Sequence, residues 1–196
     1  MNKSVKFYFD FISPYSYMAW SQLSDVTQRT NVLFETIPIS VGALMREVGN
    51  RPTSIECAAK AAYSMQDLTR WAKRLRIPIT PNPRMLTMDT RPMLMGAISA
   101  QHLGVMSEYI AAVFEGMWRN ASPFDKPEVL LKAIEKVPQA RKLVADAYDG
   151  SLRETLKANT AQAVADGAFG VPSFVYEGKL FFGNDRMMFL EEAIAL

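Results

Sequence analysis

Residues 7–17 read Phe-Tyr-Phe-Asp-Phe-Ile-Ser-Pro-Tyr-Ser-Tyr, an apolar and aromatic stretch that runs directly into Ser13-Pro14. The apolar run predicts a buried strand over Val5–Phe9. Pro14 suits the first position of a helix, because that position needs no N–H and the φ angle of proline is already helical. The stretch therefore predicts a strand followed at once by a helix, with Ser13 as the helix N-cap.

Ser13 has two interpretations. As an N-cap it lies beside unpaired backbone N–H groups and the positive end of the helix dipole. Such a position attracts anions, including a thiolate, which makes Ser13 a candidate for a binding or catalytic role. The alternative is a serine that only caps the helix, and capping serines are the commoner kind.

Outward from this stretch, both ends of the chain contain strands. Apolar residues at helical spacing predict a helix over Pro14–Thr30, and β-branched residues predict a second strand over Val32–Ile37. Near the C-terminus, Glu177-Gly178 separates two short apolar runs, which predicts a tight hairpin. The predicted elements of this end are the strands Ser173–Tyr176 and Lys179–Phe182 and the helix Met187–Ala195.

The middle of the chain predicts helices and almost no strand. Capping boxes at Thr53-x-x-Glu56 and Ser151-x-x-Glu154 mark two helix starts. The first helix is expected to extend through Arg76 and the second to end at Gly167, a natural residue to follow a helix. The tract Pro78–Pro83 is expected to be a loop. Four further helices are expected, over Pro92–Leu103, Ser107–Arg119, Lys126–Lys136 and Gln139–Ala147.

Composition limits the class of function. The chain has 196 residues, of which 49% are hydrophobic and 21% charged, as in an ordinary globular protein with one large core. Its 22 basic and 20 acidic residues are well mixed, so nothing indicates a nucleic-acid partner. The sequence has no apolar run typical of a signal peptide or a membrane span. We therefore expect a cytoplasmic protein without a membrane partner.

The rare residues exclude two further classes. Cys57 is the one cysteine, so the chain can form neither an internal disulfide nor a Cys-x-x-Cys pair. We expect this cysteine to be a buried, inert residue of a helix. His102 is the one histidine, so we expect no metal site of the usual His/Cys kind.

A βαβ unit, a helical block and a ββα unit, in this order, make up the arrangement of a thioredoxin fold. We therefore expect an α/β protein in which residues 1–42 and 168–196 form a discontinuous thioredoxin-like domain and residues 43–167 form a large helical insertion domain. This fold has a cis Xaa-Pro bond before its third strand, and Val171-Pro172 stands at that place. Most Xaa-Pro bonds are trans, so the expectation of a cis bond rests on position in the fold. A cis bond leaves the backbone N–H and C=O of Val171 open to a ligand bound in extended form.

Several segments together resemble the 2-hydroxychromene-2-carboxylate isomerase family, a DsbA-like group of the thioredoxin superfamily related to the kappa-class glutathione transferases. These segments are Phe7–Tyr17, Gly49–Pro52, Asp67–Ala72, Gly170–Phe174 and Gly183–Arg186. In the disulfide oxidoreductases of this superfamily, the position of Ser13 holds the first active-site cysteine. Here Ser13-Pro14-Tyr15-Ser16 replaces Cys-x-x-Cys, so dithiol chemistry is impossible. The resemblance implies that glutathione supplies the thiol.

The resemblance also implies an activity. It is the glutathione-dependent cis–trans isomerisation of 2-hydroxychromene-2-carboxylate-type intermediates in aromatic hydrocarbon degradation, by reversible thiolate addition. The implied partners are glutathione, a small aromatic carboxylate substrate and a second copy of the chain in a homodimer. Ser13 takes the catalytic role and holds the sulfur as a thiolate. The implied glutathione-binding residues are Ser13, Asn50, Val171, Pro172, Asn184 and Asp185.

Two of these residues have structural alternatives. Asp185 is implied to face the α-amino group of the γ-glutamyl end, and the alternative is a helix N-cap. Asn50 is implied to reach the sulfur or the glycyl end, and the alternative is a turn formed with Gly49.

Substrate recognition departs from the family pattern. The isomerases tend to have a lysine in the loop after the second strand, suited to the substrate carboxylate, and this chain has none between Val41 and Met45. Arg46 or Arg51 is the expected replacement, and Asn82 remains in the proline-rich tract as a third candidate. Two other functions stay open: a kappa-class-like glutathione transferase that conjugates electrophiles, and a non-catalytic binding protein with a thioredoxin fold.

Overall fold

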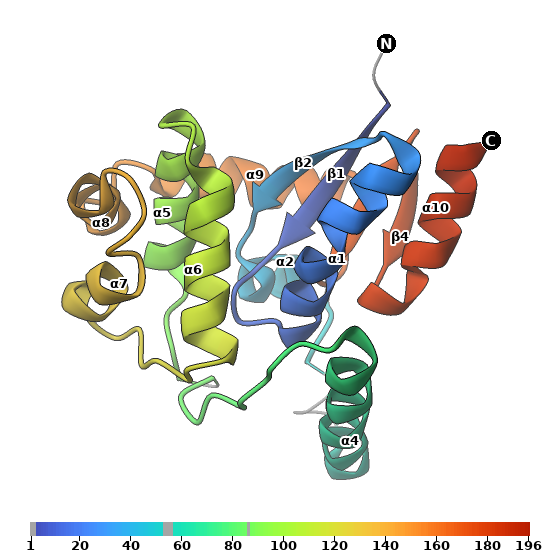
Figure 1. The fold of residues 1–196 in the computed structure, drawn as a ribbon, viewed down its shortest axis with the longest axis horizontal. Helices are drawn as coiled ribbons and strands as arrows, with labels where there is room; N and C mark the ends of the chain where they lie inside the picture. Colours follow the sequence, from blue (N-terminus) through green and yellow to red (C-terminus); the bar gives the residue numbers. More distant parts are fainter. Residues whose placement is uncertain (1–2, 53–56, 86) are drawn as a thin grey trace.

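The computed structural model describes residues 3–52, 57–85 and 87–196, and its centre is a mixed four-stranded sheet (Figure 1). The strand order is β2-β1-β3-β4. β1 runs parallel to β2 and antiparallel to β3, and β3 is antiparallel to β4. The strands are β1 (Ser4–Phe9), β2 (Leu33–Pro38), β3 (Ser173–Tyr176) and β4 (Lys179–Phe182). The two central strands therefore come from opposite ends of the chain.

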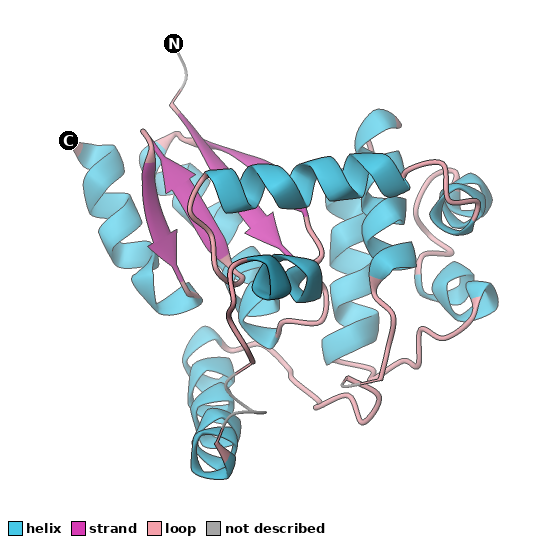
Figure 2. Cartoon of the chain, turned by 180° about the vertical axis from the view of Figure 1, so that it is seen from behind, coloured by secondary structure: helices cyan, strands magenta, loops and turns pink. Residues whose placement is uncertain are grey.

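Helices cover both faces of the sheet. Successive side chains of a strand point to opposite faces, and β1 uses both. Phe7 and Phe9 pack in the core with α1 (Pro14–Thr30) and α10 (Met187–Ala195). Tyr8 packs on the other side with residues of α2 (Val41–Glu47) and α9 (Arg153–Ala165). Figure 2 shows this second face from the front.

The remaining helices lie beside the sheet and below it (Figure 1). They are α4 (Ala58–Leu75), α5 (Arg91–His102), α6 (Met106–Trp118), α7 (Pro127–Ala133) and α8 (Ala140–Tyr148). The core of this block is continuous with that of the sheet, since the rings of Phe11 and Phe114 lie 4.9 Å apart. Leu68 and Ala72 of α4 pack on Met18 of α1, so α4 is held close to the start of α1.

The thioredoxin-like fold with its large helical part is confirmed, and the bounds of α1, β3, β4 and α10 are those that the sequence predicts. The hairpin is confirmed, with positive φ angles at both Glu177 (49°) and Gly178 (73°), as a primed two-residue turn requires. Gly167 follows α9 with a φ of 86°. The division into residues 1–42 with 168–196 and residues 43–167 stays a prediction. We note that α9, from the middle range, packs against the sheet.

Two expectations were wrong, and one helix, α2, was not predicted. Ser151 does not cap α9, because its hydroxyl donates to Asp149 Oδ1 (2.7 Å) and the N-cap is Leu152. Cys57 is not a buried helix residue but the half-exposed N-cap of α4, where the backbone N–H groups of Lys60 and Ala59 lower the pKa of its thiol. The predicted box Thr53–Glu56 lies outside the described residues.

Among the helices in the described ranges, none combines the length and the apolar character that a membrane span needs.

Candidate functional site

Ser13 occupies the turn between β1 and α1. The N–H of Ser13 donates to the carbonyl of Asp10 (3.1 Å), which closes a turn directly after the strand. The Ser13 hydroxyl accepts from Ser16 N–H (3.1 Å), and Pro14 is the first helical residue. The predicted N-cap is therefore confirmed. The first turn of α1 has no acidic residue, so no carboxylate in that turn neutralises the positive end of the helix dipole.

The peptide bond between Val171 and Pro172 is cis, as predicted from its position, and it lies beside Ser13. The Ser13 hydroxyl donates to the Val171 carbonyl over 3.3 Å. On the other side of the loop, Gly183 N–H donates to the Pro172 carbonyl (2.9 Å). Across the three described ranges, the N–H of Val171 donates to no backbone or side-chain acceptor. The loop thus presents an unused donor next to a polar hydroxyl.

Asn184 and Asp185 form the short 3-10 turn η1 (Asn184–Arg186), which packs on the adjacent α1. Asn184 is buried, yet its side-chain Nδ2 has no hydrogen-bond partner in the described part of the chain. The carboxylate of Asp185 contacts Arg186 and sits close to the backbone, since a Cβ on Gly183 would lie 2.5 Å from Asp185 Oδ1. Asp185 does not cap α10, whose N-cap is Arg186, so the structural alternative for Asp185 is wrong.

Tyr15 connects η1 with α4. Its hydroxyl donates to Asp67 Oδ2 of α4 (3.2 Å). Burial, together with the nearby carboxylates of Asp67 and Asp185, raises the pKa of Tyr15 to about 12. Two acidic side chains therefore flank a residue of the first turn of α1, and a ligand's ammonium group is the natural counter-ion for such a pair.

Asn50 binds the loop that precedes the cis-proline. Its Nδ2 donates to the Phe169 carbonyl (2.7 Å), and its Oδ1 accepts from Arg51 N–H (2.8 Å). Gly49 has a φ of 71°, so the turn proposed as the alternative for Asn50 is present. Asn50 thus contacts Phe169, which is two positions before Val171, and the side-chain amide of Asn50 holds the loop.

The three candidates for substrate binding lie in different surroundings. Arg46 is an exposed residue of α2, and Arg51 is exposed in the loop after it. Asn82 is buried: its amide donates to the Ser122 carbonyl (3.0 Å) and its oxygen accepts from Arg84 N–H (3.0 Å). These bonds hold the proline-rich tract against the end of α6.

Sequence reasoning missed Asp10 and Ser16, and it gave no role to Tyr15. Asp10 is a buried carboxylate at the end of β1, and an acidic residue in an otherwise apolar run is the signal that marks it. Ser16 is fully buried, and its Oγ has no partner within the described residues.

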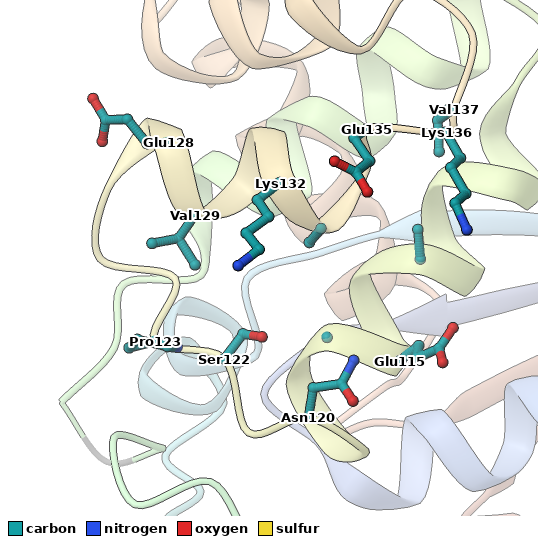
Figure 3. Close-up of a pocket in the computed structure, with 13 residues that line it drawn as sticks. Glu115, Asn120, Ser122, Pro123, Glu128, Val129, Lys132, Glu135, Lys136 and Val137 are labelled. Atoms are coloured by element: carbon teal, nitrogen blue, oxygen red, sulfur yellow. The ribbon is translucent and has the colours of Figure 1, made fainter.

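A cavity of about 810 Å³ lies elsewhere, between α6 and α7 (Figure 3). Side chains of both charges, among them Glu115, Glu128, Lys132 and Lys136, surround its opening, and it contains no residue of the predicted site. Within the described ranges, no three His, Cys, Asp or Glu side chains gather as a metal site would need. A helix N-terminus, the Ser13 hydroxyl and the cis-proline loop converge at one place, and we take this place as the candidate site.

Comparison with known proteins shows the family of the chain. A family model described as a DSBA-like thioredoxin domain matches residues 4–195. A 2-hydroxychromene-2-carboxylate isomerase of Sphingobium xenophagum is 34% identical over 97% of both chains. The glutathione S-transferase kappa 1 of Caenorhabditis elegans is 30% identical over 97% of this chain and 90% of its own. A solved structure of a 2-hydroxychromene-2-carboxylate isomerase superposes with a TM-score of 0.85 at 26% identity, covering 98% of this chain and 94% of the other.

Proposed function

The chain belongs to the DSBA-like thioredoxin family, in the group of the 2-hydroxychromene-2-carboxylate isomerases, and from this premise we propose that it is a glutathione-dependent isomerase. Its substrates are 2-hydroxychromene-2-carboxylate-type intermediates of aromatic hydrocarbon degradation. The observation that carries the proposal is the Ser13 hydroxyl, held at the N-terminus of α1 and 3.3 Å from the carbonyl of Val171. No cysteine accompanies it in the turn, so the reacting sulfur has to come from a ligand.

The residues of the site fit glutathione. An extended tripeptide needs backbone groups to pair with. Val171 has an unused N–H, and among the described residues its carbonyl accepts a hydrogen bond only from the Ser13 hydroxyl. Its γ-glutamyl end has a carboxylate and an ammonium group. The unpartnered Nδ2 of the buried Asn184 is a donor for the former, and Asp185 is an acceptor for the latter. Asn50 stands on the other side of Val171, toward the glycyl end.

Glutathione, if held by these residues, would supply a thiolate nucleophile for reversible addition to the conjugated carbon of the substrate, and it would not be consumed. Ser13 turns its hydroxyl from the Val171 carbonyl to the sulfur and stabilises the charged form. The first turn of α1 adds its N–H groups and dipole. Each unit by which the thiol pKa falls corresponds to about 1.4 kcal/mol. Arg46 or Arg51 holds the substrate carboxylate.

Two measurements test the proposal. Isothermal titration calorimetry with glutathione is expected to show binding that is weakened by Asn184→Ala and Asp185→Ala. An absorbance assay with the hydroxychromene carboxylate is expected to show isomerisation that requires glutathione and leaves its concentration unchanged. Absence of binding would leave a non-catalytic thioredoxin-fold protein as the conclusion.

A kappa-class-like transferase is the second candidate, because the similarity to the nematode kappa enzyme spans nearly the whole chain. Consumption of glutathione with a model electrophile such as chlorodinitrobenzene, without isomerisation, would identify this activity. As part of the first proposal we also infer a cytoplasmic homodimer, as the family resemblance implies. Light scattering of the purified protein measures the number of subunits.

A further inference from the structure

Asp10 is a buried carboxylate to which the proposed mechanism assigns no role. It lies where β1 ends and the turn to Ser13 begins, and only 1% of its surface is exposed. Two backbone donors hold it: Ile12 N–H donates to Oδ1 (3.1 Å), and Val41 N–H donates to Oδ2 (3.0 Å). The hydroxyl of Thr90 lies near enough to lower the pKa of the carboxyl.

These donors come from two separate segments, the turn itself and the start of α2, and the Thr90 hydroxyl lies nearby at the start of α5. An ionised carboxylate only accepts, so it matches both backbone donors at once. An asparagine would present an NH₂ group to one of the N–H groups and leave a buried donor without a partner. Among the described residues, no lysine or arginine forms an ion pair with Asp10. The charge is therefore stabilised by hydrogen bonds alone.

The carboxylate acts directly on the turn that places Ser13. The carbonyl of Asp10 accepts from Ser13 N–H, so the two residues are the ends of one turn, with their Cα atoms within about 7 Å. Ile12, whose N–H binds the carboxylate, is the residue before Ser13. The carbonyl of Phe11 accepts from the indole N–H of Trp118 (2.9 Å). Every residue of the turn thus has a hydrogen bond that fixes its orientation.

We propose that Asp10 is a positioning residue for Ser13: its ionised carboxylate locks the turn in the orientation that holds the Ser13 hydroxyl at the cis-proline loop, and protonation of this carboxylate releases the turn. The inference rests on the proposed function, because a hydroxyl in this place affects turnover only when a sulfur is bound beside it. A protonated carboxyl becomes a donor on one oxygen, so one of the two backbone N–H partners then faces a donor in place of an acceptor.

Burial is the main reason why this proton uptake falls in a mildly acidic range. Burial raises the pKa of Asp10, the hydrogen bonds from Val41 and Ile12 and the Thr90 hydroxyl oppose the rise, Asp89 adds to it, and the resulting pKa is about 6. Asp89 is itself paired with Arg91. The other charged groups on the neighbouring elements lie elsewhere: Arg46 and Glu47 are at the far end of α2, and Glu115 pairs with Arg119 on α6.

Nuclear magnetic resonance tests the coupling without glutathione or substrate. The ¹³C signal of the Asp10 carboxyl, assigned with Asp10→Asn, is followed from about pH 5 to about pH 8 together with the backbone amide signals. We expect the amides of Ile12, Ser13 and Val171 to move with the midpoint of the carboxyl. Thr90→Val removes the hydroxyl that lowers the pKa of the Asp10 carboxyl, so this variant should raise the common midpoint. The matched control Thr30→Val, at the far end of α1, should leave it unchanged.

The inference is overturned if the Ser13 and Val171 amides do not follow the carboxyl, or if Thr90→Val leaves the midpoint where it was. A kinetic measurement adds a second readout: Asp10→Asn should lower kcat about ten- to a hundredfold, abolish the acidic limb of its pH profile, and change the Kd of glutathione little. An equal loss of binding and turnover would indicate a merely structural role. If Asp10→Asn does not fold, the milder Thr90→Val decides the question. If the protein proves inactive as an isomerase, the proposed function fails, while the amide titrations still decide whether Asp10 controls the turn.

Discussion

Replacement of Ser13 by alanine separates the two roles of its hydroxyl. The hydroxyl caps α1 by accepting from Ser16 N–H, and loss of a serine cap costs about 1 kcal/mol of stability. In the proposed mechanism the same hydroxyl donates to the sulfur, and a hydrogen bond to a charged group contributes about 1.5–3 kcal/mol. At about 1.4 kcal/mol per pKa unit, its loss raises the pKa of the bound thiol by about one to two units.

The expected result is therefore a selective loss of turnover. Near neutral pH the thiolate population falls about ten- to a hundredfold in Ser13→Ala, and kcat falls with it. The Kd of glutathione changes little, because Val171, Asn184 and Asp185 hold the peptide and lie outside the mutation. The assay is thiolate absorbance of bound glutathione against pH, combined with kcat for isomerisation.

The matched control is Ser99→Ala. Ser99 is buried, and its hydroxyl donates to Asp146 Oδ2 (2.6 Å) between α5 and α8, away from the cis-proline loop. This variant should lose stability of similar size and retain its turnover. The reasoning is refuted if Ser13→Ala titrates its bound thiol at the wild-type midpoint, or if Ser99→Ala loses as much turnover as Ser13→Ala does.

Three further predictions concern stability. Burial is the main cause that raises the pKa of Asp10 from 3.8 to about 6, so folding favours its protonated form. This contribution to the free energy of unfolding, about 3 kcal/mol, is complete below about pH 4 and is lost as the pH rises through about 6. Urea unfolding at a series of pH values measures the change, and Asp10→Asn should make the free energy of unfolding less dependent on pH. Burial alone would raise the pKa of Asp166, but hydrogen bonds led by that from Lys6 hold it below its normal value; Asp166→Asn should cost about 1–2 kcal/mol at neutral pH and less in acid, with kcat unchanged. Gly96→Ala would place a Cβ 2.7 Å from Cζ of the buried Tyr109 and should lower Tm at a cost of about 1–3 kcal/mol, whereas an unchanged Tm would show that the ring can move.

The elements that the sequence predicts well are those with a local signal. Pro14 and the apolar spacing after it define α1, and Glu177-Gly178 defines the hairpin, because each depends on residues close in sequence. The helix α2 escaped prediction, since seven residues including Gly42 give too few turns for a periodic pattern. The prediction that Ser151 caps α9 was wrong because the Ser151 hydroxyl binds Asp149, two residues earlier, in place of the helix N-terminus.

The site shows the same limit. Helix capping predicts the conformation of Ser13 from its neighbours in sequence. Position in the fold predicts the cis bond before Pro172. The contacts of Asp10 with Val41 and Thr90 join segments far apart in the chain, and no local pattern announces them. The link from Tyr15 to Asp67 likewise depends on how α4 packs on α1.

The separation between Ser13 and Val171, which are 158 positions apart, has a consequence for biosynthesis. On the ribosome, β1, α1 and β2 emerge early and can associate, but the opposite edge of β1 waits for β3. Pairing over so long a loop is slow to form. A nascent chain therefore carries an unsatisfied strand edge through most of its synthesis. The turn at Ser13 can form early from local bonds, but its contact with the Val171 carbonyl has to wait until the last part of the chain has emerged.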